Sequence, residues 1–304
     1  MQREPGTVRT WWTGPALASA SVACGIAYLL MAGAPARMIA MNVAAWLIGL
    51  AAYATSAVPK WRIDGSLLLL GLGLVLLAAT LAGTPVEGAA RWVSVGPVTV
   101  QVSLIILPMA IVLFARAPDL RGVVGIGLAA LALALQPDRA MAGALAAGLA
   151  TPALLRRDRL SLAGFGLAAA AFVATLARPD RLPAVPFVDQ VFYSSFDVHP
   201  LVGAAVLIGT GLLLVPAFLR YREERSAAAA FGAAWLAIAA AAVLGNYPTP
   251  VVGYGGSAIL GYLLSLAVLR PSRARARAGA RPEMAPGRSD GDQSLKAAVT
   301  VPSG

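Results

Sequence analysis

Charged residues are scarce in this chain. Asp, Glu, Lys and Arg make up 12% of its 304 residues, against roughly 25% in soluble globular proteins. Hydrophobic residues make up 59%, and the mean hydropathy is +0.75. The apolar runs do not alternate with the two-residue period of a membrane β-barrel. The composition therefore predicts an all-α, polytopic integral membrane protein, in which helices satisfy the backbone polar groups within the bilayer.

Residues that build common catalytic and metal sites are also few. The chain has one cysteine, Cys24, and one histidine, His199. It therefore cannot form an internal disulfide or a histidine-based metal cluster. The motifs GxxxxGK[ST], GxSxG, HExxH and CxxC are absent. His199 precedes Pro200, so we expect it to cap a helix or lie at the membrane interface rather than to catalyse a reaction.

Long apolar stretches predict about ten transmembrane helices, because a bilayer core takes roughly 17–25 apolar residues per span. The chain divides into an N-terminal segment (1–12), a transmembrane domain (13–269) and a basic tail (270–304) that we expect to be disordered. The predicted spans are residues 13–32, 38–58, 65–83, 100–115, 121–136, 140–155, 160–177, 198–219, 227–246 and 251–269.

The basic residues predict the orientation of these spans. If both termini lie on one side, that side carries most of the 24 Lys and Arg residues. The other side has only Arg37, Arg91, Arg139, Arg178 and Arg181. Positive charge marks the cytoplasmic side, so both termini are predicted to be cytoplasmic. Because topology accounts for the net charge of +10, we expect contacts with membrane lipids and no nucleic-acid partner.

Two connections on the predicted outer side contain residues that could carry chemistry. Asp189 stands in an apolar stretch, where burial would raise its pKa towards that of a general base; the alternative is a solvated loop carboxylate. Arg91-Trp92 could bind a phosphate group, or anchor the chain at the lipid headgroups. Asp138-Arg139 is expected to form a structural turn. Residues 253–257, rich in glycine, follow two prolines and could either pack closely or open a cleft.

Four stretches, taken in order, resemble the motifs of one known family. Residues 88–103 resemble GxRRWI…QPSE, and residues 136–138 resemble QPDLGT. Residues 189–204 resemble DFIFAxxxEExGLLGA, and residues 250–257 resemble PFISYGGSS. The family is SEDS (shape, elongation, division and sporulation; the FtsW/RodA/SpoVE type), and the resemblance predicts a SEDS-like bundle. The candidate site residues at these positions are Arg91, Trp92, Gln101, Ser103, Asp138, Asp189, Asp197, Tyr254, Gly255, Gly256 and Ser257.

The resemblance implies a peptidoglycan glycosyltransferase for cell division or cell shape. It would polymerise lipid II at the periplasmic face of the bacterial inner (cytoplasmic) membrane, with a class B penicillin-binding protein as partner. Asp189 would be the catalytic base, and Arg91 would face the departing pyrophosphate, whose charge Mg²⁺ or Mn²⁺ could share. The remaining matched residues would bind substrate. A lipid-linked substrate would reach the site through a groove between helices.

The chain departs from the family pattern at several positions. Leu104 and Leu107 stand where QPSExxK has Glu and Lys, and Ala90 replaces one Arg of RRW. An alternative is therefore a SEDS relative without catalysis that acts as a scaffold for lipid II or for a penicillin-binding protein. A flippase for lipid-linked sugars ranks last, because transporters place charges near the bilayer midplane and few lie there in this chain.

Overall fold

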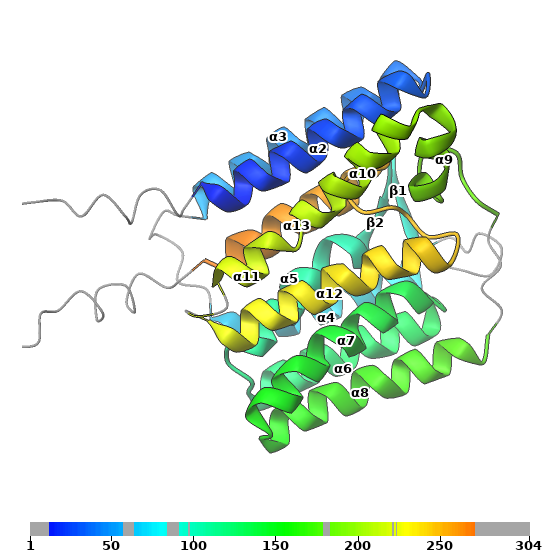
Figure 1. Cartoon of the computed structure of the whole chain (residues 1–304). Helices are drawn as coiled ribbons and strands as arrows, with labels where there is room; N and C mark the ends of the chain where they lie inside the picture. The colour runs from blue at the N-terminus through cyan, green and yellow to red at the C-terminus, as the bar shows by residue number, and fades with distance from the viewer. Residues whose placement is uncertain are drawn as a thin grey trace, which may run out of the picture. The chain divides into compact units, whose positions relative to one another are not determined.

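The computed structural model describes residues 12–56, 64–83, 91–96, 98–178, 183–220, 222 and 224–270. This part of the chain forms a bundle of long helices with a two-stranded antiparallel hairpin, β1 (Trp92–Val95) and β2 (Val98–Gln101) (Figure 1). The predicted N-terminal segment and basic tail lie outside the described residues, except for Trp12 and Arg270. The helices are α2 (Thr13–Met31), α3 (Ala36–Thr55), α4 (Gly65–Ala82), α5 (Val102–Arg116), α6 (Leu120–Leu135), α7 (Arg139–Arg156), α8 (Arg159–Leu176), α9 (Val191–Val198), α10 (Pro200–Leu212), α11 (Val215–Arg220), α12 (Arg225–Leu244) and α13 (Gly256–Val268).

Each predicted span corresponds to helix in the described part of the chain, with two corrections. The eighth span is divided into α10 and α11, where Leu213 and Leu214 donate to carbonyls only three residues back and Pro216 follows. The tenth span begins at Gly256 rather than residue 251. Pro248 and Pro250 explain this delay, because proline lacks the N–H that a helix interior requires.

Among the described residues, six helical segments could cross a membrane by length and composition: α2, α3, α4, α8, the α10–α11 segment and α12. Helices α5, α6 and α13 are apolar but shorter. Helix α7 is rich in alanine and glycine and contacts α5, α8 and α12. A less apolar helix is tolerated there, because small residues allow close helix packing. The structure is therefore that of an all-α, multi-pass membrane protein, as predicted.

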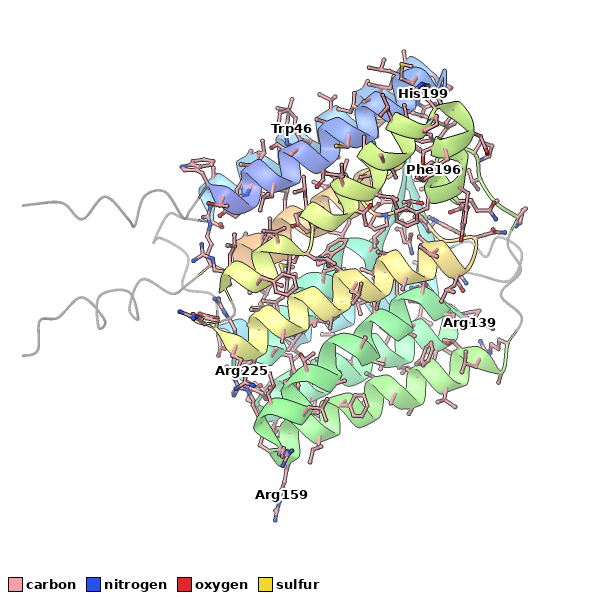
Figure 2. The ribbon with its side chains drawn as sticks, in the orientation of Figure 1. Trp46, Arg139, Arg159, Phe196, His199 and Arg225 are labelled. Carbon is pink, nitrogen blue, oxygen red and sulfur yellow. The ribbon has the colours of Figure 1, made fainter. Side chains whose placement is uncertain are left out.

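Both described ends of the chain lie at one end of the bundle, where Thr13 and Arg270 line the same small cavity. Arg159 and Arg225 are at this end too, whereas Arg139 lies at the opposite end (Figure 2). This arrangement requires an even number of crossings, in agreement with the sequence. We name the opposite end, which carries α9 and the hairpin, the distal end. Its assignment to the periplasm stays a prediction.

Two glycines bring α2 and α13 close to their neighbours. A Cβ at Gly25 of α2 would lie 2.7 Å from the carbonyl oxygen of Val252, and a Cβ at Gly261 of α13 would overlap that of Leu104 in α5. Such contacts favour glycine because they leave no room for a side chain. They hold the segment before α13 against α2, and α13 itself against the start of α5.

Candidate active site at the distal end

Asp189 is a buried carboxylate, only 8% exposed. It pairs with Pro248 in an isolated antiparallel bridge, and its Oδ2 accepts a hydrogen bond from the Val185 N–H at 2.8 Å. Burial raises the pKa of Asp189, while the Val185 N–H and the positive charge of Arg91 offset part of that rise. A carboxylate with a raised pKa is the stronger base. The described structure thus does not have the solvated loop carboxylate that the sequence left as an alternative.

Arg91 is also buried, at 4% exposure. Its Nη2 donates to the carbonyl oxygen of Pro137 at 2.7 Å, and its Cζ lies 5.8 Å from the centre of the Tyr247 ring. Tyr247 directly precedes Pro248, the bridge partner of Asp189, so the loop after α12 joins both charged groups. The burial of Arg91 argues against simple anchoring to lipid headgroups. It places a guanidinium where it could neutralise an anion beside Asp189.

Asp138 organises a buried polar cluster. Its Oδ2 accepts hydrogen bonds from Gln101 Nε2 at 3.2 Å and Ser103 Oγ at 3.1 Å, while its Oδ1 accepts from the Met141 N–H at 3.2 Å and caps α7. Asp138 and Ser103 have no exposed surface, and Gln101 is 7% exposed. These contacts give the three residues a structural role, and the expectation that they contact substrate stays a prediction. They fix the start of α5 against the start of α7. This positions the carbonyl of Pro137, which precedes α7, to accept the hydrogen bond from Arg91.

The glycine-rich segment Tyr254–Ser257 packs against this cluster and against the Asp189 loop. Ser257 Oγ accepts from the backbone N–H of Gln101 at 3.1 Å, and the backbone N–H of Tyr254 donates to Phe187 O at 2.7 Å. Gly256 packs closely, since a Cβ there would lie 3.2 Å from that of Ala45, whereas a Cβ at Gly255 would meet only that of Ala258, at 4.0 Å. Asn42 of α3 holds the same segment, and the sequence analysis did not identify it.

Asp197 lies apart from the buried cluster. It is exposed on α9, where it lines an open groove of about 730 Å³. Phe192, Phe196 and Leu207 are among its apolar walls, and Phe196 lies with α9 at the distal end (Figure 2). The other lining residues are Tyr193, Thr210, Leu236, Ala239, Ala240 and Val243. A groove with mostly apolar walls and one carboxylate suits a chain-like lipid next to a polar head.

Helix α9 and the β1–β2 hairpin are short elements that were not predicted from the sequence. Helix α9 follows Gln190, whose φ of 56° turns the chain from the Asp189 bridge directly into the helix. The hairpin pairs Trp92 with Gln101, so the half-buried Trp92 lies beside the Asp138 cluster. In the sequence, Gly96-Pro97 stands between two Val-rich segments, and this pattern could have predicted the hairpin. The capping role expected for His199 is confirmed, since its Nδ1 accepts from the Leu201 N–H at 3.2 Å at the start of α10.

Ligands for a divalent cation are few among the described side chains near Asp189. The described residues contain no group of three or more His, Cys, Asp or Glu that could hold a metal. The nearby carboxylate of Asp138 is already bonded to Gln101, Ser103 and the Met141 N–H. Mg²⁺ and Mn²⁺ favour several oxygen ligands, and Asp189 alone supplies few. The predicted involvement of Mg²⁺ or Mn²⁺ remains a prediction.

Comparisons with known proteins agree with this fold. No protein-family model matches the chain. The crystal structure of the rod shape determining protein RodA of Thermus thermophilus superposes with a TM-score of 0.60 and 21% identity, over 85% of this chain and 94% of that one. An aspartate-to-alanine mutant of the same protein gives the same TM-score, over 95% of its chain. At this identity the likeness establishes the fold.

A local sequence match adds to the structural likeness. A segment of 63 residues is 43% identical to a protein of Shewanella sediminis (strain HAW-EB3) named Probable peptidoglycan glycosyltransferase FtsW. Both matches are with proteins of the FtsW/RodA type, the type that the four sequence motifs resemble. The matched segment is 19% of this chain and 15% of the FtsW protein, so the similarity does not by itself assign an activity, a substrate or a partner to this chain.

The structure also shows how this chain accommodates its departures from the SEDS motif that it resembles. Leu104 is 3% exposed and Leu107 is fully buried, and both belong to the main apolar core. Replacing a buried ion pair by apolar residues can be neutral or favourable for stability. The loss of the motif's Glu and Lys is therefore compatible with a well-packed α5, and it removes two charged groups from the distal end.

Proposed function

We propose that the chain is a peptidoglycan glycosyltransferase that polymerises lipid II at the periplasmic face of the bacterial cytoplasmic membrane. The observation that carries this proposal is the buried carboxylate of Asp189, close enough to Arg91 for that charge to influence its pKa. Its position at the distal end, together with the predicted orientation, puts the chemistry outside the cytoplasm. The SEDS fold supports the reaction class by analogy.

The two buried groups suit the two charge changes of glycosyl transfer. As the hydroxyl oxygen of the acceptor sugar bonds to the anomeric carbon of the donor, Asp189 takes the hydroxyl proton. The bond between that carbon and the pyrophosphate oxygen breaks, and the lipid pyrophosphate leaves with the bonding electrons. Arg91 stabilises the resulting negative charge. Its hydrogen bond to Pro137 O holds the guanidinium in place before the reaction.

The groove between α9, α10 and α12 supplies access from the membrane. Helix α9 begins two residues after Asp189, and its Phe192 and Phe196 line the groove. We propose that the isoprenoid chain of the lipid substrate lies there, with Asp197 at its polar end. Widening or filling this groove should change the apparent KM for lipid II more than kcat, because its residues do not touch the reacting atoms.

A polymerisation assay tests the proposed function. The purified chain is incubated with labelled lipid II, alone and with Mg²⁺ or Mn²⁺, with and without the class B penicillin-binding protein of the same cell. Glycan strands in any of these conditions support the proposal. If no condition yields polymer while the preparation binds lipid II, polymerase activity is refuted.

A scaffold is the second candidate, and the apolar Leu104 and Leu107 favour it. On this hypothesis the chain makes no polymer under any metal condition, yet co-purifies with a penicillin-binding protein. Restoring both charges tests the difference. If the doubly substituted Leu104→Glu, Leu107→Lys protein gains polymerisation that the natural chain lacks, the natural chain is the scaffold.

A further inference from the structure

Asn42 is a buried amide in α3, 1% exposed, and both ends of its side chain are bonded to one backbone segment. Its Nδ2 donates to Gly253 O at 3.0 Å, and its Oδ1 accepts from the Gly255 N–H at 3.1 Å. The side-chain amide therefore satisfies the backbone carbonyl of Gly253 and the backbone N–H of Gly255, as a neighbouring strand would in a sheet. A buried amide with both groups satisfied fixes its partners strongly, since a buried partner that lost its hydrogen bond would have no water to replace it.

The segment that Asn42 holds is also the one that clamps the Asp189 loop. The Tyr254 N–H donates to Phe187 O at 2.7 Å, and the Thr249 N–H donates to Val188 O at 2.9 Å. Pro248 then forms the bridge with Asp189. Residues 248–254 thus contact all three residues 187–189. Asn42 is hydrogen-bonded to the end of this segment, at Gly253 and Gly255.

Packing makes Asn42 the anchor of this assembly. Ala45, one turn further along α3, faces Gly256 at the start of α13, and Gly49 faces Leu263. Asn42, Ala45 and Gly49 lie on one face of α3. Ala45 and Gly49 pack on α13, so this face of α3 is fixed along much of its length. The amide projects from a rigid helix onto a segment that lacks regular secondary structure.

We propose that Asn42 is a positioning residue for Asp189, acting through the segment 248–254 without touching the carboxylate. This inference rests on the proposed function for its catalytic readout, but the clamp itself is structural and can be tested separately. Asparagine is the side chain required, because it offers one donor and one acceptor at matched positions. Aspartate lacks the donor for Gly253 O, and alanine lacks both groups.

Hydrogen exchange measures the clamp without any assay of activity. In the Asn42→Ala protein the peptide covering residues 246–256 should exchange faster, because the Gly255 N–H loses its acceptor, Asn42 Oδ1, and the segment that carries the Thr249 and Tyr254 amides is no longer held by α3. Trp46→Phe is the matched control. It removes another hydrogen bond of α3, from Trp46 Nε1 to Ser19 Oγ at 2.9 Å, but on the side of α2, and should leave this peptide unchanged. Unaltered exchange in Asn42→Ala overturns the inference.

The kinetic readout distinguishes positioning from general loss of folding. Asn42→Ala should lower kcat about 10- to 100-fold with little change in KM, because small displacements of a catalytic group are costly. The acid limb of its rate–pH profile should move to lower pH as water reaches Asp189. Asn42→Asp should lie between the natural protein and Asn42→Ala. If exchange increases but the natural chain makes no polymer, the proposed function fails and the clamp stands; full kcat with increased exchange refutes the positioning role.

Discussion

Replacing Asp138 by alanine removes a fully buried carboxylate that accepts hydrogen bonds from Gln101, Ser103 and the Met141 N–H. Two buried side-chain donors left without an acceptor cost about 1–3 kcal/mol each, and the lost helix cap adds about 1 kcal/mol. Gln101 Nε2 and Ser103 Oγ, already 3.4 Å apart, can compensate each other in part. We therefore expect Asp138→Ala to lower the free energy of unfolding by about 3–5 kcal/mol.

Asp158 provides the matched control at the other end of the bundle. It caps α8 in the same way, accepting from the Leu160 and Ser161 N–H groups at 3.0 and 2.9 Å and from Ser161 Oγ at 2.7 Å, but it is only partly buried. Its replacement by alanine removes a cap and the acceptor of one hydroxyl, and should cost about 2 kcal/mol. Equilibrium unfolding in mixed detergent micelles, followed by tryptophan fluorescence, measures both variants. Equal losses for Asp138→Ala and Asp158→Ala would refute the claim that the buried cluster organises the distal end.

Three further predictions concern the site and its packing. Because burial raises the pKa of Asp189 and a base acts deprotonated, the polymerisation rate should fall as pH drops through a pKa above the usual aspartate value of about 4; a rate unchanged down to about pH 4 would contradict this. Arg91→Lys should lower kcat/KM for lipid II about 10- to 100-fold, because lysine lacks the planar fork that binds phosphate; kinetics equal to those of the natural chain would remove Arg91 from the mechanism. Gly261→Ala should destabilise the protein by several kcal/mol, because its Cβ would overlap the Leu104 carbonyl, whereas Gly71→Ala, with nothing within 4 Å of the added Cβ, should be neutral or stabilising in the same unfolding assay.

The apolar runs predicted the helices well, because a bilayer-length hydrophobic stretch has few alternative structures. What composition could not predict is where a span breaks. Pro216 lies inside a continuous apolar run, and the division of α10 from α11 before it depends on local backbone hydrogen bonds. Helix α9 has only eight residues, too few for an apolar run to predict it, and it begins after one residue in the left-handed conformation, Gln190.

The candidate site was predicted from motif residues rather than from contacts, and this explains which of its contacts the sequence could not give. Sequence placed Asp189 and Arg91 in separate connections, and the structure brings them to one loop through Tyr247 and Pro248. The sequence could not show that Asp138 is buried, because an aspartate that caps a helix and one that binds substrate look alike in sequence. Asn42 was missed since a lone asparagine in an apolar helix carries no pattern.

Glycan polymerisation by purified Asp189→Asn protein tests the proposed catalytic role most directly. The substitution keeps the size of the side chain and an acceptor for the Val185 N–H, but it removes the base. We predict normal folding, retained binding of lipid II and polymerisation at least about 100-fold slower than that of the natural chain. Polymerisation at the natural rate by the folded Asp189→Asn protein would contradict the assignment of Asp189 as the base.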